Sequence, residues 1–170
     1  MSVPTANPSR GPGISGSFGD VIATRVGRWP GVASVPHRLR RDPSLVDGVG
    51  FVLAGSEFGH VHDDGVVDVA VSPALRDQLL TDGLADRHRT TPGEPGVSYY
   101  VRSPADVPGA IRLCRLAYLR RLVTEPAAAD LAPTVDPWAE LDRLGASQPV
   151  RSVLRRESVS QPVRPVRGEL

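Results

Sequence analysis

A hairpin near the middle of the chain constrains the fold most strongly. Residues 58–62 (FGHVH) and 66–71 (VVDVAV) are two short apolar segments, and Asp63-Asp64-Gly65 separates them. An Asp-Gly pair between two such segments is a strong signal for a tight β-turn, because glycine readily adopts the positive φ that the turn requires. We therefore expect the two segments to be adjacent antiparallel strands.

The length of this turn decides what faces the histidines of the first strand. In a regular strand Phe58, His60 and His62 share one face. A three-residue loop places His60 opposite Asp68, whereas a two-residue loop places His60 opposite Val69. Both turns are allowed. The first would pair an imidazole with a carboxylate, an arrangement suited to fixing a tautomer or to general-base catalysis.

The segments around the hairpin predict an α+β fold with the order β-β-β-β-α-β-α. Further strands are expected at residues 33–38, 49–53 and 97–102. Ser72-Pro73 begins a helix that Gly83 ends, and Ser103-Pro104 begins a longer one. The longer helix carries an apolar stripe, namely Val107, Ile111, Cys114, Tyr118 and Leu122. An antiparallel sheet of about five strands with two helices packed on one face is the most economical arrangement of these elements.

Proline and glycine divide the chain into three parts. The sequence has 17 residues of each type among 170, and segments rich in them bury too little apolar surface to offset the entropy of ordering. We therefore predict a disordered segment over 1–19, a folded domain over 20–124, and a mostly disordered tail over 125–170. Within the tail, Asp136-Pro137 begins a short helix over 136–145. This helix either docks on the domain, binds a partner, or does neither.

The bulk composition argues against several partners. With a net charge of +1 and no dense basic patch with stacking aromatics, the chain is expected to bind neither nucleic acid nor a membrane surface. No apolar run approaches the roughly 20 residues of a membrane span. The single Cys114 excludes an internal disulfide and is expected to be a buried, inert thiol. With no secretory signal visible, a cytoplasmic location is expected, with a small molecule as the ligand; the sequence does not define an oligomeric state.

Several short motifs resemble the luciferase-domain family over about residues 22–123. They are Trp29-Pro30-Gly31-Val32, Pro36-His37-Arg38, residues 57–62 (EFGHVH), residues 72–79 (SPALRDQL), Asp86-Arg87-His88, residues 97–102 (VSYYVR) and residues 116–119 (LAYL). The namesakes of that family are fungal luciferases, which oxygenate a hydroxylated hispidin pyrone with molecular oxygen and emit light. Most other members are bacterial proteins with no assigned activity. The resemblance implies an α+β domain and, if the chain is an enzyme, an oxygenase acting on an enolic or phenolic small molecule.

All four histidines of the chain fall in these motifs. We expect His60, His62 and His88 to form a candidate catalytic site with Asp68, whereas His37, which follows a proline on a short strand, is expected to be structural. In one interpretation a histidine of this site is a general base and no cofactor is needed. In another, His60, His62 and His88 bind a divalent metal together with Asp68 or Glu57. In a third the face binds a ligand without chemistry, and in a fourth the histidines only stabilise the sheet.

Overall fold

The computed structural model describes residues 17–89 and 95–160. Its sheet has six strands, all antiparallel, in the spatial order β1-β2-β3-β4-β6-β5. The strands are β1 (Ala33–Leu39), β2 (Asp42–Leu53), β3 (Ser56–Val61), β4 (Val66–Ala70), β5 (Asp86–Arg87) and β6 (Gly96–Tyr100). The helices are α1 (Phe18–Val26), α2 (Pro73–Thr81), α3 (Val107–Thr124), α4 (Pro126–Leu131), α5 (Pro137–Arg143) and α6 (Gln148–Val159), with a single 3₁₀ turn at Pro104–Asp106. The predicted α+β class is confirmed.

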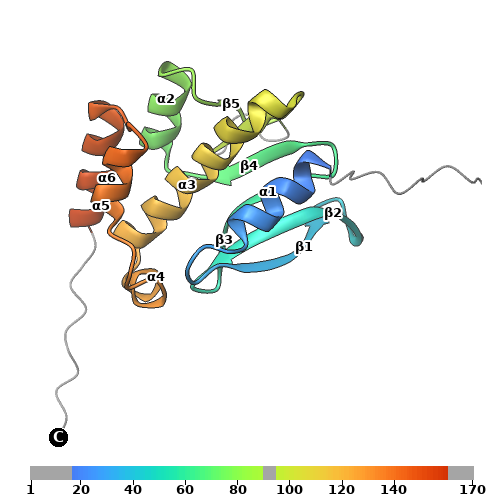
Figure 1. Cartoon of the computed structure of the whole chain (residues 1–170), viewed down its shortest axis with the longest axis horizontal. Coiled ribbons are helices and arrows are strands. Elements are labelled where there is room, and N and C mark those ends of the chain that lie inside the picture. The colour runs from blue at the N-terminus through green and yellow to red at the C-terminus, as the bar shows by residue number, and fades with distance from the viewer. Residues whose placement is uncertain (1–16, 90–94, 161–170) are drawn as a thin grey trace, which may run out of the picture.

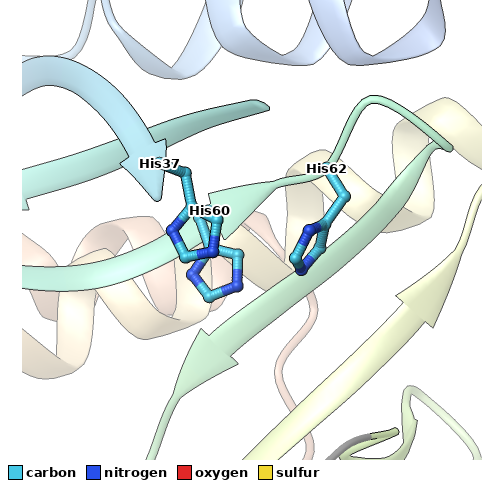
Figure 2. A group of neighbouring side chains, drawn as sticks. All are labelled: His37, His60 and His62. Carbon is cyan, nitrogen blue, oxygen red and sulfur yellow. The ribbon is translucent and has the colours of Figure 1, made fainter. Parts of the chain in front are cut away.

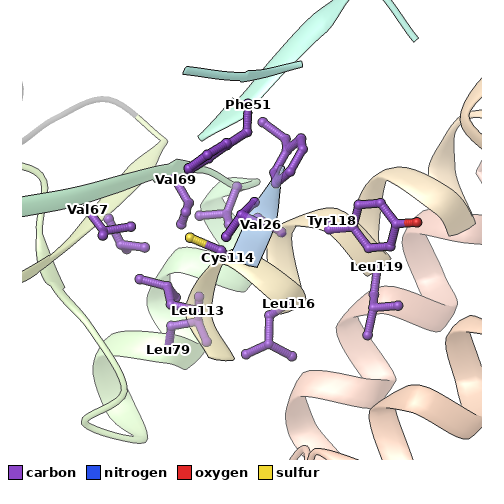
Figure 3. Close-up of a cluster of buried hydrophobic side chains, with 14 of the residues drawn as sticks. Val26, Phe51, Val67, Val69, Leu79, Leu113, Cys114, Leu116, Tyr118 and Leu119 are labelled. Atoms are coloured by element: carbon purple, nitrogen blue, oxygen red, sulfur yellow. The ribbon is translucent and has the colours of Figure 1, made fainter. Parts of the chain in front are cut away.

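The helices pack on one face of the sheet, with α1 and α3 directly against the strands (Figure 1). Val67 and Val69 of β4 are buried beneath α3, where Tyr118, Cys114 and neighbouring leucines complete the core (Figure 3). The stripe predicted for α3 is buried except at Ile111, which is only partly covered. Within the described ranges, no helix is both long and apolar enough to cross a bilayer.

The helix α1 begins inside the segment that was expected to be disordered. Ser17 and Asp20 form a reciprocal cap, since the backbone N–H of each residue donates to the side chain of the other, at 2.9 and 3.1 Å. Ile22 and Val26 are fully buried against the sheet. These contacts stabilise a helix that starts within the 1–19 segment, whose residues 1–16 lie outside the described residues.

The segment after α3 corrects the prediction of a mostly disordered tail over 125–170. Residues 126–159 form α4, α5 and α6, and residues 161–170 lie outside the described part of the chain. The predicted 136–145 helix is α5, and it docks on the domain through the fully buried Leu141. In α6, Val150 and Leu154 are fully buried, because a spacing of four residues places them on the same helix face. The core therefore extends to α6.

The hairpin between β3 and β4 has the three-residue turn. Gly65 has φ of 85°, and His60 lies opposite Asp68 in the register. The preceding part of β3 is irregular, since Phe51 pairs with Gly59 but Val52 pairs with Glu57. The extra residue of this β-bulge is Phe58. Phe58 consequently packs into the core, so the expectation that it shares a face with His60 is wrong.

Candidate functional site

The histidine site is built on the sheet face that points away from the helices. His60 of β3 lies beside Asp68 of β4, and Asp68 lies beside Ser98 of β6. Because side chains alternate along a strand, Val67 and Val69 point into the core while Asp68 between them points to the opposite face. Three neighbouring strands therefore present an imidazole, a carboxylate and a hydroxyl in one row.

Asp68 is the centre of this row. Its Oδ2 lies 2.9 Å from Nε2 of His62, 3.4 Å from Nε2 of His60 and 3.8 Å from Nε2 of His88. Its Oδ1 accepts a hydrogen bond from the hydroxyl of Ser98. Asp68 is 3% exposed. The structure thus brings together all four residues expected at the candidate site, and Ser98 is a fifth that the sequence patterns did not indicate.

Two further carboxylates contact the far sides of the imidazole rings. Oε1 of Glu57 lies 2.7 Å from Nδ1 of His60, and Oδ2 of Asp47 lies 2.7 Å from Nδ1 of His62. The bulge at Phe58 makes the first contact possible, because it places Glu57 on the same face as His60. Asp47 reaches the site from β2. No local motif marks Asp47, and it was not predicted.

His37 lies beside this cluster. Its ring stacks on that of His60, with 3.6 Å between centroids and 13° between planes, and His62 lies edge-on to both rings (Figure 2). Nδ1 of His37 lies 3.7 Å from Oε1 of Glu57. His37 was expected to be a structural residue outside the site. The structure places it beside the site, and its role stays a prediction.

Burial and charged neighbours shift the pKa values of three groups in and beside the site, namely His60, Asp68 and His37. Burial acts to lower the pKa of His60, but hydrogen bonds with Asp68 and Glu57 outweigh burial and raise that pKa to about 9. Burial acts to raise the pKa of Asp68, but hydrogen bonds from His60, His62 and Ser98 hold it far below its usual range. Burial and the nearby His60 lower the pKa of His37. The cluster thus favours a positive charge at His60 between two ionised carboxylates.

A small hollow opens beside the cluster. It has a volume of about 150 Å³, and its polar wall is formed by Glu57, His60, Asp68 and His88. The backbone N–H of Arg89, shortly after β5, donates to Oγ of Ser98 at 3.2 Å, so Arg89 lies against β6 beside Asp68. A larger hollow of about 400 Å³ lies between α2, α3 and α6, away from the histidines. We assign the site to the smaller hollow, because imidazole and carboxylate groups converge in its wall.

The family comparison matches the part of the chain that carries this row of side chains. Residues 55–117 match the family model described as the luciferase domain. This segment is similar to the luciferase domain. No curated protein and no solved structure gave a significant match to the chain. The resemblance seen in the sequence motifs is therefore confirmed at the level of the family.

The segment that matches the luciferase-domain model runs from the turn before β3 into α3. It contains Glu57, His60, His62, Asp68 and His88, whereas His37 and Asp47 precede it. The catalytic role expected for His60, His62, His88 and Asp68 stays a prediction. Cys114, also inside the match, is fully buried and free, and burial raises the pKa of its thiol to about 12.

Proposed function

We propose that this luciferase domain binds a small enolic or phenolic molecule in the hollow beside Asp68 and oxygenates it with molecular oxygen. The observation that carries the proposal is the convergence of the His60 and His88 imidazoles and the Asp68 carboxylate in the wall of one hollow. Perturbed, partly buried ionisable groups in a pocket are typical of catalytic sites. The family resemblance supports the substrate class and the oxidant.

The size of the hollow restricts the ligand. Its volume of about 150 Å³ is below the roughly 300–1,000 Å³ of ordinary ligand pockets. A single ring therefore fits, either as a whole molecule or as the reactive ring of a larger one. Gly96 leaves room for the ring of His88 in this wall, because a Cβ at residue 96 would lie 3.1 Å from Cδ2 of His88.

The proposed reaction needs one proton acceptor and no oxidant other than O₂. The His88 imidazole accepts the hydroxyl proton of the bound enol, because His60, with its raised pKa, already carries a proton. The enolate carbon then forms a C–O bond with O₂, so that the carbon is oxidised by two electrons and oxygen is reduced to the peroxide level. Return of the proton gives a hydroperoxide. Asp68, held by Ser98, orients the imidazoles for this exchange.

The test uses 4-hydroxy-6-methyl-2-pyrone as the probe, with an oxygen electrode and mass spectrometry of the products. We expect oxygen uptake and a product heavier by one O₂, and we expect His60→Ala and His88→Ala to abolish both. Arg156→Ala, in the wall of the larger hollow, is the matched control and should behave as wild type. Binding of the pyrone without oxygen uptake would reduce the proposal to a binding module. Neither binding nor uptake, with His60→Ala lowering stability by about 1–3 kcal/mol, would show that the histidines are structural.

A further inference from the structure

His60 and His62 each have more carboxylate neighbours than a neutral imidazole can donate hydrogen bonds to. Each ring has a carboxylate on both nitrogens: Glu57 and Asp68 for His60, and Asp47 and Asp68 for His62. A neutral imidazole carries only one N–H, so it can donate to only one of its two carboxylates. The other nitrogen would then direct a lone pair at an ionised oxygen. In the metal-free protein a second proton on the ring removes this conflict, as the raised pKa of His60 indicates. Both rings approach the same atom, Oδ2 of Asp68, which is where a metal ion could take the place of that proton.

We propose that a divalent transition-metal ion binds between Nε2 of His60, Nε2 of His62 and Oδ2 of Asp68, which leaves the imidazole of His88 as the proton acceptor. Such an ion removes the conflict, because each ring then donates its Nδ1–H to an outer carboxylate and offers its Nε2 lone pair to the metal. Two imidazoles with a carboxylate are a donor set typical of zinc and of non-haem iron. The inference deepens the proposed function, since the ion would bind the deprotonated oxygen of the enol.

The distances between the donor atoms agree with a shared ion. Two ligands about 2.1 Å from one metal are about 3.0 Å apart at a right angle and about 3.4 Å apart at a tetrahedral angle. Nε2 of His62 and of His60 lie 2.9 and 3.4 Å from Oδ2 of Asp68. The planes of these two rings are 85° apart, so their in-plane lone pairs can meet at one point.

The outer carboxylates supply independent support. In proteins, a histidine that binds a metal usually donates its second ring N–H to a carboxylate or a carbonyl, which fixes the tautomer. Glu57 on His60 and Asp47 on His62, both at 2.7 Å from Nδ1, occupy these positions. The Oδ1 atom of Asp68 is held in the same way by Ser98.

A second grouping, His37 with His60 and His62, also brings its nitrogens within 4.8 Å of one another. An imidazole binds a metal in the plane of its ring. The rings of His37 and His60 are nearly parallel and 3.6 Å apart, so no point lies in both planes near the nitrogens. The geometry therefore favours the set centred on Asp68, and His37 becomes the matched control for it.

The experiment is a calorimetric titration of Co²⁺ into full-length protein that has been stripped with EDTA and dialysed. We expect one site per chain in the wild type and in His37→Ala. Asp68→Asn should lose at least about 100-fold in affinity, and Glu57→Gln should lose about 10- to 100-fold, as expected for an outer carboxylate. Circular dichroism checks that each variant is folded. No pyrone is used, so failure here and failure of the oxygenation test are separate results.

A second readout does not depend on the variants. In ¹⁵N spectra of the histidine rings of wild-type protein, Zn²⁺ should shift the Nε2 signals of His60 and His62 and leave those of His37 nearly unchanged. Absence of a Co²⁺ site, equal loss of affinity in His37→Ala and Asp68→Asn, or unmoved Nε2 signals would each overturn the inference.

Discussion

Glu57 and His60 are three residues apart on β3, yet Oε1 of Glu57 lies 2.7 Å from Nδ1 of His60. In a regular strand these two side chains would point to opposite faces. The bulge at Phe58 inverts the alternation, burying the phenyl ring in the core and turning Glu57 toward the imidazole. One irregularity of the strand thereby serves both the packing and the site.

A substitution at Gly50 tests the contact between Glu57 and His60, because the Glu57 carboxylate lies in the space that a side chain at residue 50 would occupy. A Cβ at Gly50 would be 2.6 Å from Oε2 of Glu57. The atom in the way is the end of a flexible side chain, so Gly50→Ala should fold while the carboxylate moves from His60. The pKa of His60, about 9 in the wild type, should fall. Titration of the histidine ring protons by NMR in EDTA measures it, with Glu57→Gln as a positive control. An unchanged pKa in Gly50→Ala would contradict the proposed contact.

The raised pKa of His60 makes the stability of metal-free protein depend on pH. The folded-state pKa of about 9 exceeds the ordinary value of 6.5, so the folded state holds the proton more tightly than the unfolded state. The resulting stabilisation is complete below pH 6.5 and is lost as the pH rises through about 9. Urea denaturation in EDTA should therefore show a free energy of unfolding that falls across this interval in the wild type. The fall should be weaker in His60→Gln, and equal slopes in the two proteins would count against the ion pairs at His60.

The helix α6 is predicted to be part of the folded domain. Leu154 is fully buried, whereas Val159 on the same helix is 83% exposed. Leu154→Ala should lower the free energy of unfolding by about 2–5 kcal/mol, because it leaves a cavity in the core. Val159→Ala should change it by less than about 0.5 kcal/mol. Denaturation of both variants checks this, and a neutral Leu154→Ala would show that α6 does not belong to the core.

Cys114 should be inert in the folded protein. Burial raises the pKa of its thiol to about 12, so almost no thiolate is present near pH 8. Reaction with Ellman's reagent should be very slow in buffer and rapid in concentrated urea, with one thiol released per chain. Rapid reaction of the native protein would show that the α3 face carrying Cys114 opens readily.

The sequence predicted the part of the fold that depends on local patterns. Asp63-Asp64-Gly65 predicted the hairpin, and one of its two allowed turns gave the observed pairing of His60 with Asp68. The helix α6 was not predicted, because the arginine- and proline-rich composition of the tail indicated disorder. A local signal for a helix was nevertheless overlooked. That signal was present, since Ser147 caps the helix and Val150 and Leu154 form its apolar face.

The candidate site was only partly predictable for a different reason. His60 and His62 share a strand, so their proximity follows from the period of two residues. Asp47 and His37 reach the same site through irregular parts of β1 and β2, where the register shifts. Next to Asp47 lies Gly48, whose φ of 100° is unfavourable for other residues, and a Cβ there would clash with the carbonyl oxygen of Val61. Bulges and tertiary register of this kind cannot be inferred from the spacing of residues.

The most direct test of the account is chemical-shift mapping of pyrone binding by NMR. Titration of 4-hydroxy-6-methyl-2-pyrone into ¹⁵N-labelled protein should shift the amide signals of His60, Asp68, His88 and Gly96, which line the smaller hollow. Residues of the larger hollow, such as Arg120 and Arg156, should be unaffected. Shifts confined to those arginines, or no shifts at saturating probe, would contradict the claim that the histidine cluster is the functional site of this protein.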